Sequence, residues 1–284
     1  MTTKQETEAY CIVTNGIIEQ LEQNIVPWQM AGSEAGYPRN LINKVPFRGM
    51  NVWRLASLGY QQNYFVTYKQ LKELGGTVRS GEKGHIVAFW KPKQTDVFET
   101  EEKAQLVFGY YMVYNIAQCD GLLEVCEIPQ SPYSISSFGA GEEILEMMPN
   151  RPVIKHTRQK QGYYNPVKDF ISMPKPETFP STESYYSALF PILIHSTGHG
   201  KKLNRKGIVE NPEYVNEAFS QEKLVAEIGA CLLGSATGIQ IVNGNQSDAY
   251  IKGWLETIQQ NPRMVVYASF QAQKAVEYIL NVNP

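Results

Sequence analysis

The sequence has 284 residues, of which 43% are hydrophobic and 19% are charged, and its formal net charge is −2. This length can bury a large core and is sufficient for two domains, and the composition excludes a disordered tail. The longest apolar run, around Ala188 to Ile194, is far too short to span a membrane.

The N-terminus, MTTKQETEAY, is polar and acidic and lacks the apolar region of a signal peptide. The cysteines show no paired zinc spacing and are too sparse for a disulfide framework. They are Cys11, Cys119, Cys126 and Cys231. We therefore expect a cytoplasmic protein, in a reducing compartment and without membrane contact.

In the first half of the chain, apolar residues from Ile12 to Ile25 recur about every three and a half positions, which predicts an amphipathic helix over 5–26. Further helices are predicted over 51–58 and 65–74, the latter ended by the Gly75-Gly76 pair. Strands are predicted over 77–78 and 85–90, joined by a turn at 80–84, and over 106–113.

A basic segment between Tyr37 and Lys93 holds ten Lys/Arg residues against Glu73 and Glu82, a local net charge of +8. Such an excess is typical of a surface that binds a polyanion, although a solvated basic face without a partner gives the same count.

Aromatic residues are interleaved with these cations, and the combination is typical of single-stranded nucleic-acid sites, where cations follow the phosphates and bases stack on rings. The candidate DNA-binding residues are Arg39, Lys44, Arg48, Trp53, Tyr64, Tyr68, Lys69, Arg79, Lys83, Trp90 and Lys91. Aromatics this dense also occur in hydrophobic cores, so composition alone leaves both interpretations open for any single ring.

The composition changes at 131–150, a Ser/Gly-rich stretch followed by a short predicted helix, and we place the domain boundary there. A hairpin is predicted from 162–164 and 170–173. Helices are predicted over 182–197, with Ser181 as N-cap, and over 219–233, 247–259 and 262–280.

The segment LFPILIHSTGHGKKLNR, from Leu189 to Arg205, looks like a zinc-peptidase helix that has lost part of its motif. The motif His-Glu-x-x-His puts two zinc ligands one helical turn apart and a general base beside the first. With His195 as the second ligand, Pro191 occupies the position of the first and Ile192 that of the base. Proline offers no metal-binding lone pair and isoleucine takes no proton from water, so the usual zinc-peptidase hydrolysis is excluded.

The next helix carries Glu227 as the single charge in an apolar run, LVAEIGACLLG. Such a carboxylate is a metal ligand, a buried hydrogen-bonding anchor, or a residue at the solvated edge of an amphipathic face. The pattern does not choose among the three.

The chain resembles antirestriction proteins of the ArdC type from about Tyr10 to Leu280. The motifs in the first half are IVPWQ, PRNL, PFRGMNVW, GGTVRSGEKG, VAFWK and YNIAQCDGL. Those in the second half are YYNPVKDFISMP, ESYYSALF, IHSTGHGKKLNR, EKLVAEIGACLL and FQAQKAVEYIL.

The resemblance implies an α+β fold of two domains. Residues 1–130 would form a single-stranded DNA-binding domain related to TraC-type primases, and residues 131–284 a mostly helical zincin-like domain with a small antiparallel sheet. It places His195 and Glu227 at two ligand positions. A third ligand would require His199, which follows Gly198, to swing in. We expect no required cofactor and at most weak zinc binding, with Ile192 packed against Leu224 or Ile228 and His195 paired with Glu227.

Three functions are compatible with these observations. The first is a single-stranded DNA-binding antirestriction protein of a plasmid or conjugative element, whose catalytically dead zincin-like domain is a scaffold or a surface for a host restriction protein or another protein. The alternative is a metallopeptidase with an atypical zinc site of His195, His199 and Glu227. The third is a decoy that binds a nuclease or peptide without contacting DNA. Salt-dependent oligonucleotide binding separates the first from the third, and metal analysis bears on the second.

Overall fold

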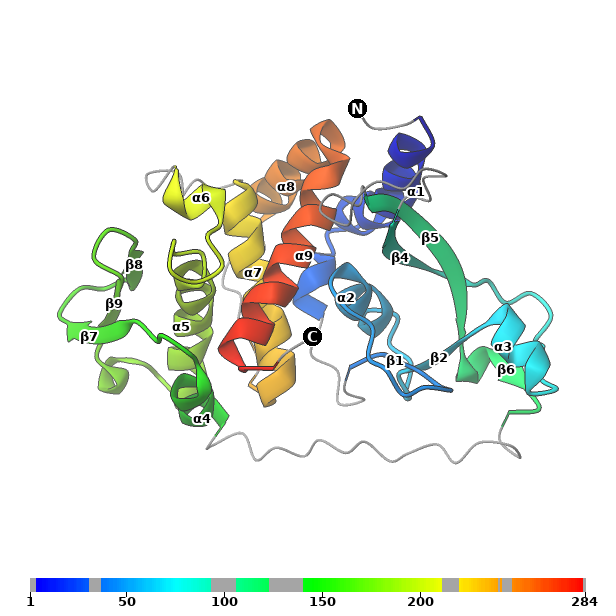
Figure 1. The fold of residues 1–284 in the computed structure, drawn as a ribbon, viewed down its shortest axis with the longest axis horizontal. Helices are drawn as coiled ribbons and strands as arrows, with labels where there is room; N and C mark the ends of the chain where they lie inside the picture. The colour runs from blue at the N-terminus through cyan, green and yellow to red at the C-terminus, as the bar shows by residue number, and fades with distance from the viewer. Residues whose placement is uncertain are drawn as a thin grey trace, which may run out of the picture.

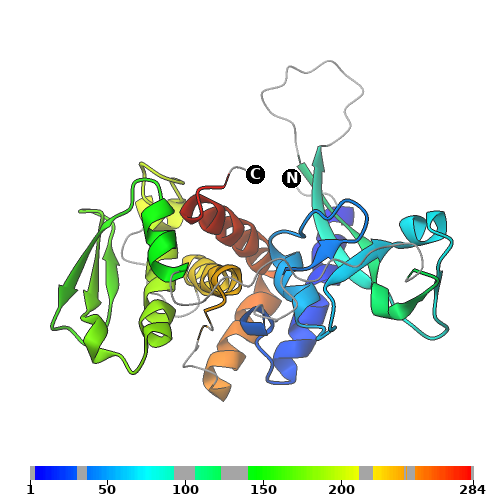
Figure 2. The same ribbon diagram turned by 90° about the horizontal axis from the view of Figure 1, so that it is seen from below.

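The structure is a computed structural model that describes residues 4–30, 37–92, 106–122, 140–210, 220–239, 241 and 247–282. A small sheet lies at one end of the molecule and a larger one at the other, with helices between them (Figures 1 and 2). This arrangement confirms the predicted α+β class.

The helices of the described chain alternate with strands in the first half and dominate the second. They are α1 (Lys4–Glu22), η1 (Pro27–Met30), α2 (Met50–Ala56), α3 (Tyr68–Glu73), η3 (Ile116–Gln118), α4 (Ala140–Met147), η4 (Pro176–Thr178), α5 (Thr182–Ser196), α6 (Lys206–Val209), α7 (Gln221–Thr237), α8 (Asp248–Gln260) and α9 (Pro262–Ile279). None of them is long and apolar enough to cross a membrane.

The three longest helices with a serine N-cap begin within two residues of their predicted starts. Ser181, Ser220 and Ser247 each accept a hydrogen bond from the backbone N–H three residues on, which satisfies one of the free donors at a helix N-terminus.

The strands form three sheets. They are β1 (Arg39–Asn40), β2 (Tyr64–Thr67), β3 (Thr77–Val78), β4 (His85–Pro92), β5 (Leu106–Asn115), β6 (Cys119–Asp120), β7 (Val153–Thr157), β8 (Tyr163–Asn165) and β9 (Phe170–Pro174). The larger sheet has the order β1-β2-β5-β4, with β1 and β2 parallel and the other pairs antiparallel. The order β7-β9-β8 contains the predicted hairpin, because β8 and β9 are antiparallel. The small sheet was expected to be antiparallel but is mixed, because β7 returns to β9 in the parallel direction.

Two predictions for the first half were wrong. The segment 65–74 is not one helix, because its first residues form β2 and pair with β5, which lies far away in sequence. The helix starts only at Tyr68, after the N-cap Thr67. The strands β3 and β4 do not form a hairpin with each other, since β3 pairs with β6 and β4 with β5.

One hydrophobic core runs through both halves of the chain. Trp28 packs edge-on against Trp53 of α2, with ring centroids 6.3 Å apart, and against Trp254 of α8, at 5.9 Å. All three indoles are fully buried. In Figure 1, α9 lies between α7 and α2. The N-terminal helices are therefore covered by C-terminal ones, and the apolar area buried between them stabilises both.

The expected boundary at residue 130 lies outside the described residues, as does the Ser/Gly-rich stretch that precedes α4.

Candidate functional site

The degenerate zincin helix is α5, which ends at Ser196, one residue before the predicted end. Pro191 and Ile192 are both half-buried on it. Ile192 faces the small sheet, because a Cβ on Gly162 would lie 2.6 Å from its Cδ1. Ile192 also packs against the core cluster that contains Leu224 and Ile228, the residues expected to contact it. Ile194 makes a close approach to α7, since its Cδ1 would be 2.8 Å from a Cβ on Gly229.

His195 has a different partner from the one expected. Its Nδ1 lies 3.4 Å from Oε1 of Glu222 on α7, and the imidazole is only 6% exposed. Glu222 is held in turn by Arg205, whose Nε lies 3.1 Å from Oε2. The Arg205 guanidinium also donates to Thr197 Oγ1 at 2.6 Å and to the Ile194 carbonyl at 2.8 Å, at the end of α5.

Within the buried cluster of His195, Glu222 and Arg205, burial and the neighbouring charges shift the pKa values of His195 and Glu222. Burial lowers the pKa of His195 below its ordinary value, against the opposing effect of the Glu222 carboxylate, so the imidazole is neutral. Burial alone would raise the pKa of Glu222, but its hydrogen bond with His195 and the charge of Arg205 lower it. The carboxylate is therefore ionised and the polar groups of the cluster satisfy one another.

Glu227, expected as a metal ligand, lies on another side of α7. Its Oε2 accepts a hydrogen bond of 2.5 Å from the Tyr250 hydroxyl of α8. Burial raises the pKa of Glu227, while the Tyr250 bond and the indole N–H groups of Trp28 and Trp254 lower it. Glu227 is half-buried, and its bond to Tyr250 joins α7 to α8, as expected of a hydrogen-bonding anchor, while His195 is paired elsewhere.

His199, the third predicted ligand, belongs to a separate cluster just after α5. Its Nδ1 is 3.9 Å from Oδ2 of Asp169, while Oδ1 of Asp169 accepts hydrogen bonds from Lys202 at 2.7 Å and Tyr164 at 2.9 Å. Burial would raise the pKa of Asp169, but the bonds from Lys202 and Tyr164 lower it. The ion pair ties the turn between β8 and β9 to the loop after α5.

These positions do not fit a three-ligand metal site. Pro191 and Ile192 offer no donor atom, and His195, His199 and Glu227 each contact a different group. Within the described part of the chain, no three His, Cys, Asp or Glu residues are grouped so that they could hold a metal ion. A zinc enzyme requires three protein ligands and an open position, which these side chains do not provide.

Among the predicted DNA-binding residues, Trp53 is corrected by the structure. Its ring is fully buried against the indole of Trp28, so neither face can stack on a base. The surrounding helix buries most of its residues, which is why an aromatic–cation pattern in sequence misassigned it.

The three predicted arginines already have partners. Arg48 forms an ion pair with Glu277 of α9, Arg79 Nε lies 2.9 Å from Oδ1 of Asp120, and Arg39 donates to a backbone carbonyl in the next loop. The side chains of Arg48 and Arg79 remain about half exposed, at 49% and 50%. Both can still contact a ligand, with part of their charge neutralised.

Other predicted residues are exposed. Tyr68 and Trp90 have 55% and 38% of their surface accessible. Lys44 Nζ lies 5.3 Å from the ring centroid of Tyr64, and Lys83 is exposed in the turn before β4.

Two further lysines complete the predicted set. Lys69 is exposed and lies 3.9 Å from the Glu73 carboxylate, a long ion pair one helical turn apart. Lys91 pairs through its backbone with Val107 in β5, and its side chain is not among those described.

Sequence reasoning missed three exposed residues on β5. Tyr110, Tyr111 and Met112 are 39%, 37% and 40% exposed. A strand with one solvated face normally alternates apolar and polar side chains, and the run FGYYMVY does not. That departure from alternation was the available signal.

Comparison with known proteins assigns the two halves separately. Residues 7–115 match the N-terminal domain of anti-restriction factor ArdC, and residues 142–271 match a zincin-like metallopeptidase domain. DNA primase TraC of Escherichia coli is 30% identical over 291 residues, which cover 94% of this chain and 26% of the primase. The chain thus spans only a fraction of the primase. The uncharacterized protein y4eC of Sinorhizobium fredii is 26% identical, with 98% of this chain and 93% of that protein covered.

Two solved structures are similar over nearly the whole chain. The metal-free crystal structure of antirestriction protein ArdC from the R388 plasmid has a TM-score of 0.74 and 32% identity, and covers 97% of this chain and 99% of that one. Its Mn(II)-bound structure has a TM-score of 0.72 and 32% identity, and covers 96% and 97%. With both domains present and in the same order, the chain belongs to the ArdC antirestriction family.

Proposed function

We propose that this protein binds single-stranded DNA through its N-terminal half and that its zincin-like half does not hydrolyse peptide bonds. The observation that carries the proposal is a set of exposed aromatic rings on β4 and β5, within or next to the segment of +8 net charge. The names of the relatives, an antirestriction protein of a plasmid and a primase, agree with a role in plasmid or conjugative DNA transfer.

The register of β4 and β5 puts two of these rings, Trp90 and Tyr110, on one face and Tyr111 on the other. Trp90 pairs with Phe108, and Ala88, two residues before Trp90, pairs with Tyr110, two residues after Phe108. Paired residues share a face, so Trp90 and Tyr110 lie at successive levels of the same face. Exposed aromatics that gather in this way mark binding surfaces, and stacking tolerates any base sequence.

The absence of hydrolysis follows from the zincin-like helix. A zinc-bound water needs a general base, and Ile192 stands where that base belongs. His195 is buried and paired with Glu222, which is already engaged by Arg205. We therefore assign this half a scaffolding role or a role as the binding surface for a host protein, such as a restriction enzyme. The alternative peptidase gains no support from the geometry.

DNA binding is tested on the intact chain, because Trp28 of the N-terminal half is buried against Trp254 of α8. We expect a labelled single strand to bind at low salt and to dissociate steeply as salt rises. Tyr110→Ala should weaken binding by about tenfold through lost stacking. Failure of the intact protein to bind any single strand at low salt would contradict the proposal.

Lysine variants sharpen the same experiment. Lys83→Ala should weaken binding for all sequences and reduce the salt slope by about one, as expected for one lost phosphate contact. Arg48→Ala should act in the same direction. Lys201→Ala is the matched control, since Lys201 is exposed in the zincin-like half and its removal should leave both affinity and slope unchanged.

The second part of the proposal is tested with casein and a peptide library, with zinc or chelator added. No cleavage is expected in either condition. A chelator-sensitive cleavage that disappears in His195→Ala would refute it and favour the atypical metallopeptidase.

A further inference from the structure

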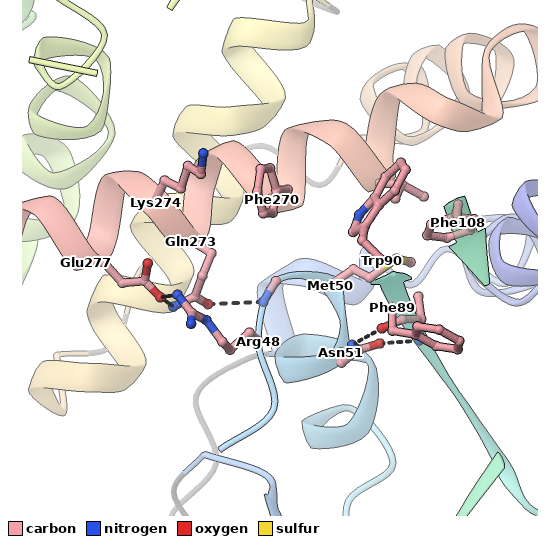
Figure 3. Close-up of a pocket in the computed structure, with 13 residues that line it drawn as sticks. Arg48, Met50, Asn51, Phe89, Trp90, Phe108, Phe270, Gln273, Lys274 and Glu277 are labelled. Atoms are coloured by element: carbon pink, nitrogen blue, oxygen red, sulfur yellow. Dashed lines mark hydrogen bonds and ion pairs between the residues drawn. The ribbon is translucent and has the colours of Figure 1, made fainter. Parts of the chain in front are cut away.

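A cavity of about 500 Å³ lies where the two halves of the chain meet (Figure 3). Its walls come from four elements: the first turn of α2 with the residues just before it, β4, β5 and one side of α9. The lining residues that matter below are Arg48, Trp90, Phe270, Gln273, Lys274 and Glu277.

Hydrogen bonds hold the walls in place on both sides. Asn51 of α2 bonds to the backbone of Ala88 in β4 in both directions, at 2.7 and 2.8 Å. The Gly49 N–H donates to Gln273 Oε1 of α9 at 3.1 Å. Figure 3 shows Gln273 and Glu277 pointing from α9 toward Arg48 and the start of α2. The cavity is thus built before any ligand arrives, and it includes residues of both halves.

Two large rings in the cavity are exposed. Trp90 of β4 is 38% accessible and Phe270 of α9 is 40% accessible, and both line it. The other three tryptophans of the chain, Trp28, Trp53 and Trp254, are fully buried. Exposed rings facing a preformed cavity favour a flat apolar ligand, such as a nucleobase, over an extended aliphatic one.

The charged groups at the rim favour an anion next to that ring. Glu277 is the carboxylate of the lining, and its Oε1 is already bonded to Arg48 and Gln273. Lys274 lies with its Nζ 4.6 Å from the Phe270 ring centroid and forms no ion pair with any described carboxylate. Two cations against one carboxylate leave a positive excess beside the rings, as a phosphate-linked base requires.

We propose that this cavity receives one base of the bound single strand, stacked against Trp90 and Phe270, while Lys274 and Arg48 contact the adjacent phosphates. The inference rests on the proposed function and extends it, because it makes α9 of the zincin-like half part of the DNA site. Trp90 shares a strand face with Tyr110, and the residues that pair with these two, Phe108 and Ala88, line the cavity. The cavity therefore adjoins the surface proposed to bind the strand, which favours a nucleotide within that strand as the occupant.

The first test uses tryptophan fluorescence of the intact protein titrated with an oligothymidylate. Because Trp90 is the exposed indole, we expect quenching that saturates with binding. Trp90→Phe should retain most of the affinity and lose the quenching. An unchanged signal on binding would overturn the inference. So would equal quenching by thymidine monophosphate at the same nucleotide concentration, which would indicate a free-nucleotide site.

The second test measures oligonucleotide affinity by anisotropy for variants of α9. Phe270→Ala should weaken binding by about tenfold. Tyr267→Ala is the matched control, since Tyr267 is 48% exposed on the same helix and does not line the cavity. Lys274→Gln should lower the salt slope by about one and keeps the test decisive if the Phe270 variant folds poorly.

The outcomes separate the two proposals. If Tyr110→Ala weakens binding while Phe270→Ala and Lys274→Gln do not, the cavity is not part of the DNA site and the proposed function stands. If the unmodified protein binds no single strand, both are lost. A peptide or a second copy of the chain that occupies the cavity, with DNA binding undisturbed, would also overturn the inference.

Discussion

The candidate functional residues are buried in the zincin-like helix pair, α5 and α7, but exposed on the β4–β5 surface. Around α5 and α7, His195, Glu222 and Arg205 are buried and bonded to one another. On β4 and β5, Trp90 and Tyr110 remain more than a third exposed.

Under the proposed function, this difference locates ligand binding on the β4–β5 surface rather than at the zincin-like helices. A buried polar group costs free energy unless it is satisfied, so a site that loses its metal ligands tends to close around internal partners. A stacking surface works only if its rings stay exposed, although exposure of apolar area is unfavourable in the free protein. Exposed rings are therefore more informative about present function than the remnant of a motif.

The largest expected effect comes from breaking the buried cluster. Glu222→Ala leaves the Arg205 charge buried without its carboxylate, and should lower the free energy of unfolding by about 3–5 kcal/mol. Glu73→Ala is the control, because the side chains of Glu73 and its ion-pair partner Lys69 are both exposed, and it should cost less than about 1 kcal/mol. Urea denaturation measures both. Similar losses in the two variants would remove the contrast between the regions.

A smaller effect is expected from restoring the lost motif with Pro191→His and Ile192→Glu. The chelated double variant should melt at a lower temperature than the unmodified protein, because a carboxylate replaces a half-buried isoleucine. Zinc should then raise its melting temperature, since saturation at a hundred times Kd adds about 2.7 kcal/mol. Adding Glu227→Gln should leave the zinc response intact, because Glu227 is bonded to Tyr250. A double variant that does not respond to zinc would show that the closed cluster cannot reopen.

The neutral state of His195 predicts a pH dependence of stability. Burial lowers the pKa of His195 in the folded protein. Below the ordinary value of 6.5, His195 therefore binds a proton in the unfolded chain but not in the folded one. The free energy of unfolding should therefore fall as pH drops from 6.5 toward the folded pKa, by at most about 1.4 kcal/mol per pH unit. His195→Gln should remove this component when urea midpoints are compared between pH 7.5 and 5.5. An identical pH profile in the variant would show that His195 does not carry it.

The smallest stability effect belongs to the exposed surface. Tyr68→Ala removes a ring that is 55% accessible and should change the free energy of unfolding by no more than about 0.5 kcal/mol. The same variant should weaken oligonucleotide binding, as a ring used for stacking would. If the free energy of unfolding falls strongly and oligonucleotide binding does not change, Tyr68 has a structural role and is not part of the DNA-binding surface.

The sequence alone determined the features that depend on local spacing. The starts of α5, α7 and α8 were predictable because Ser181, Ser220 and Ser247 each cap the helix that follows directly. The loss of the zinc motif could also be predicted from the sequence, because the motif positions lie within about one turn of a single helix.

Only the tertiary structure decided which residues face one another. Glu222 and Glu227 are five positions apart on α7, about 140° around the helix, so packing alone settles that the first meets His195 and the second meets Tyr250. Tertiary pairing also made a strand of Tyr64–Thr67, because its partner β5 is distant in sequence. In the same way Trp53 became core and Trp90 surface, and the cavity between α2, β4 and α9 exists because residues far apart in the chain fold against each other.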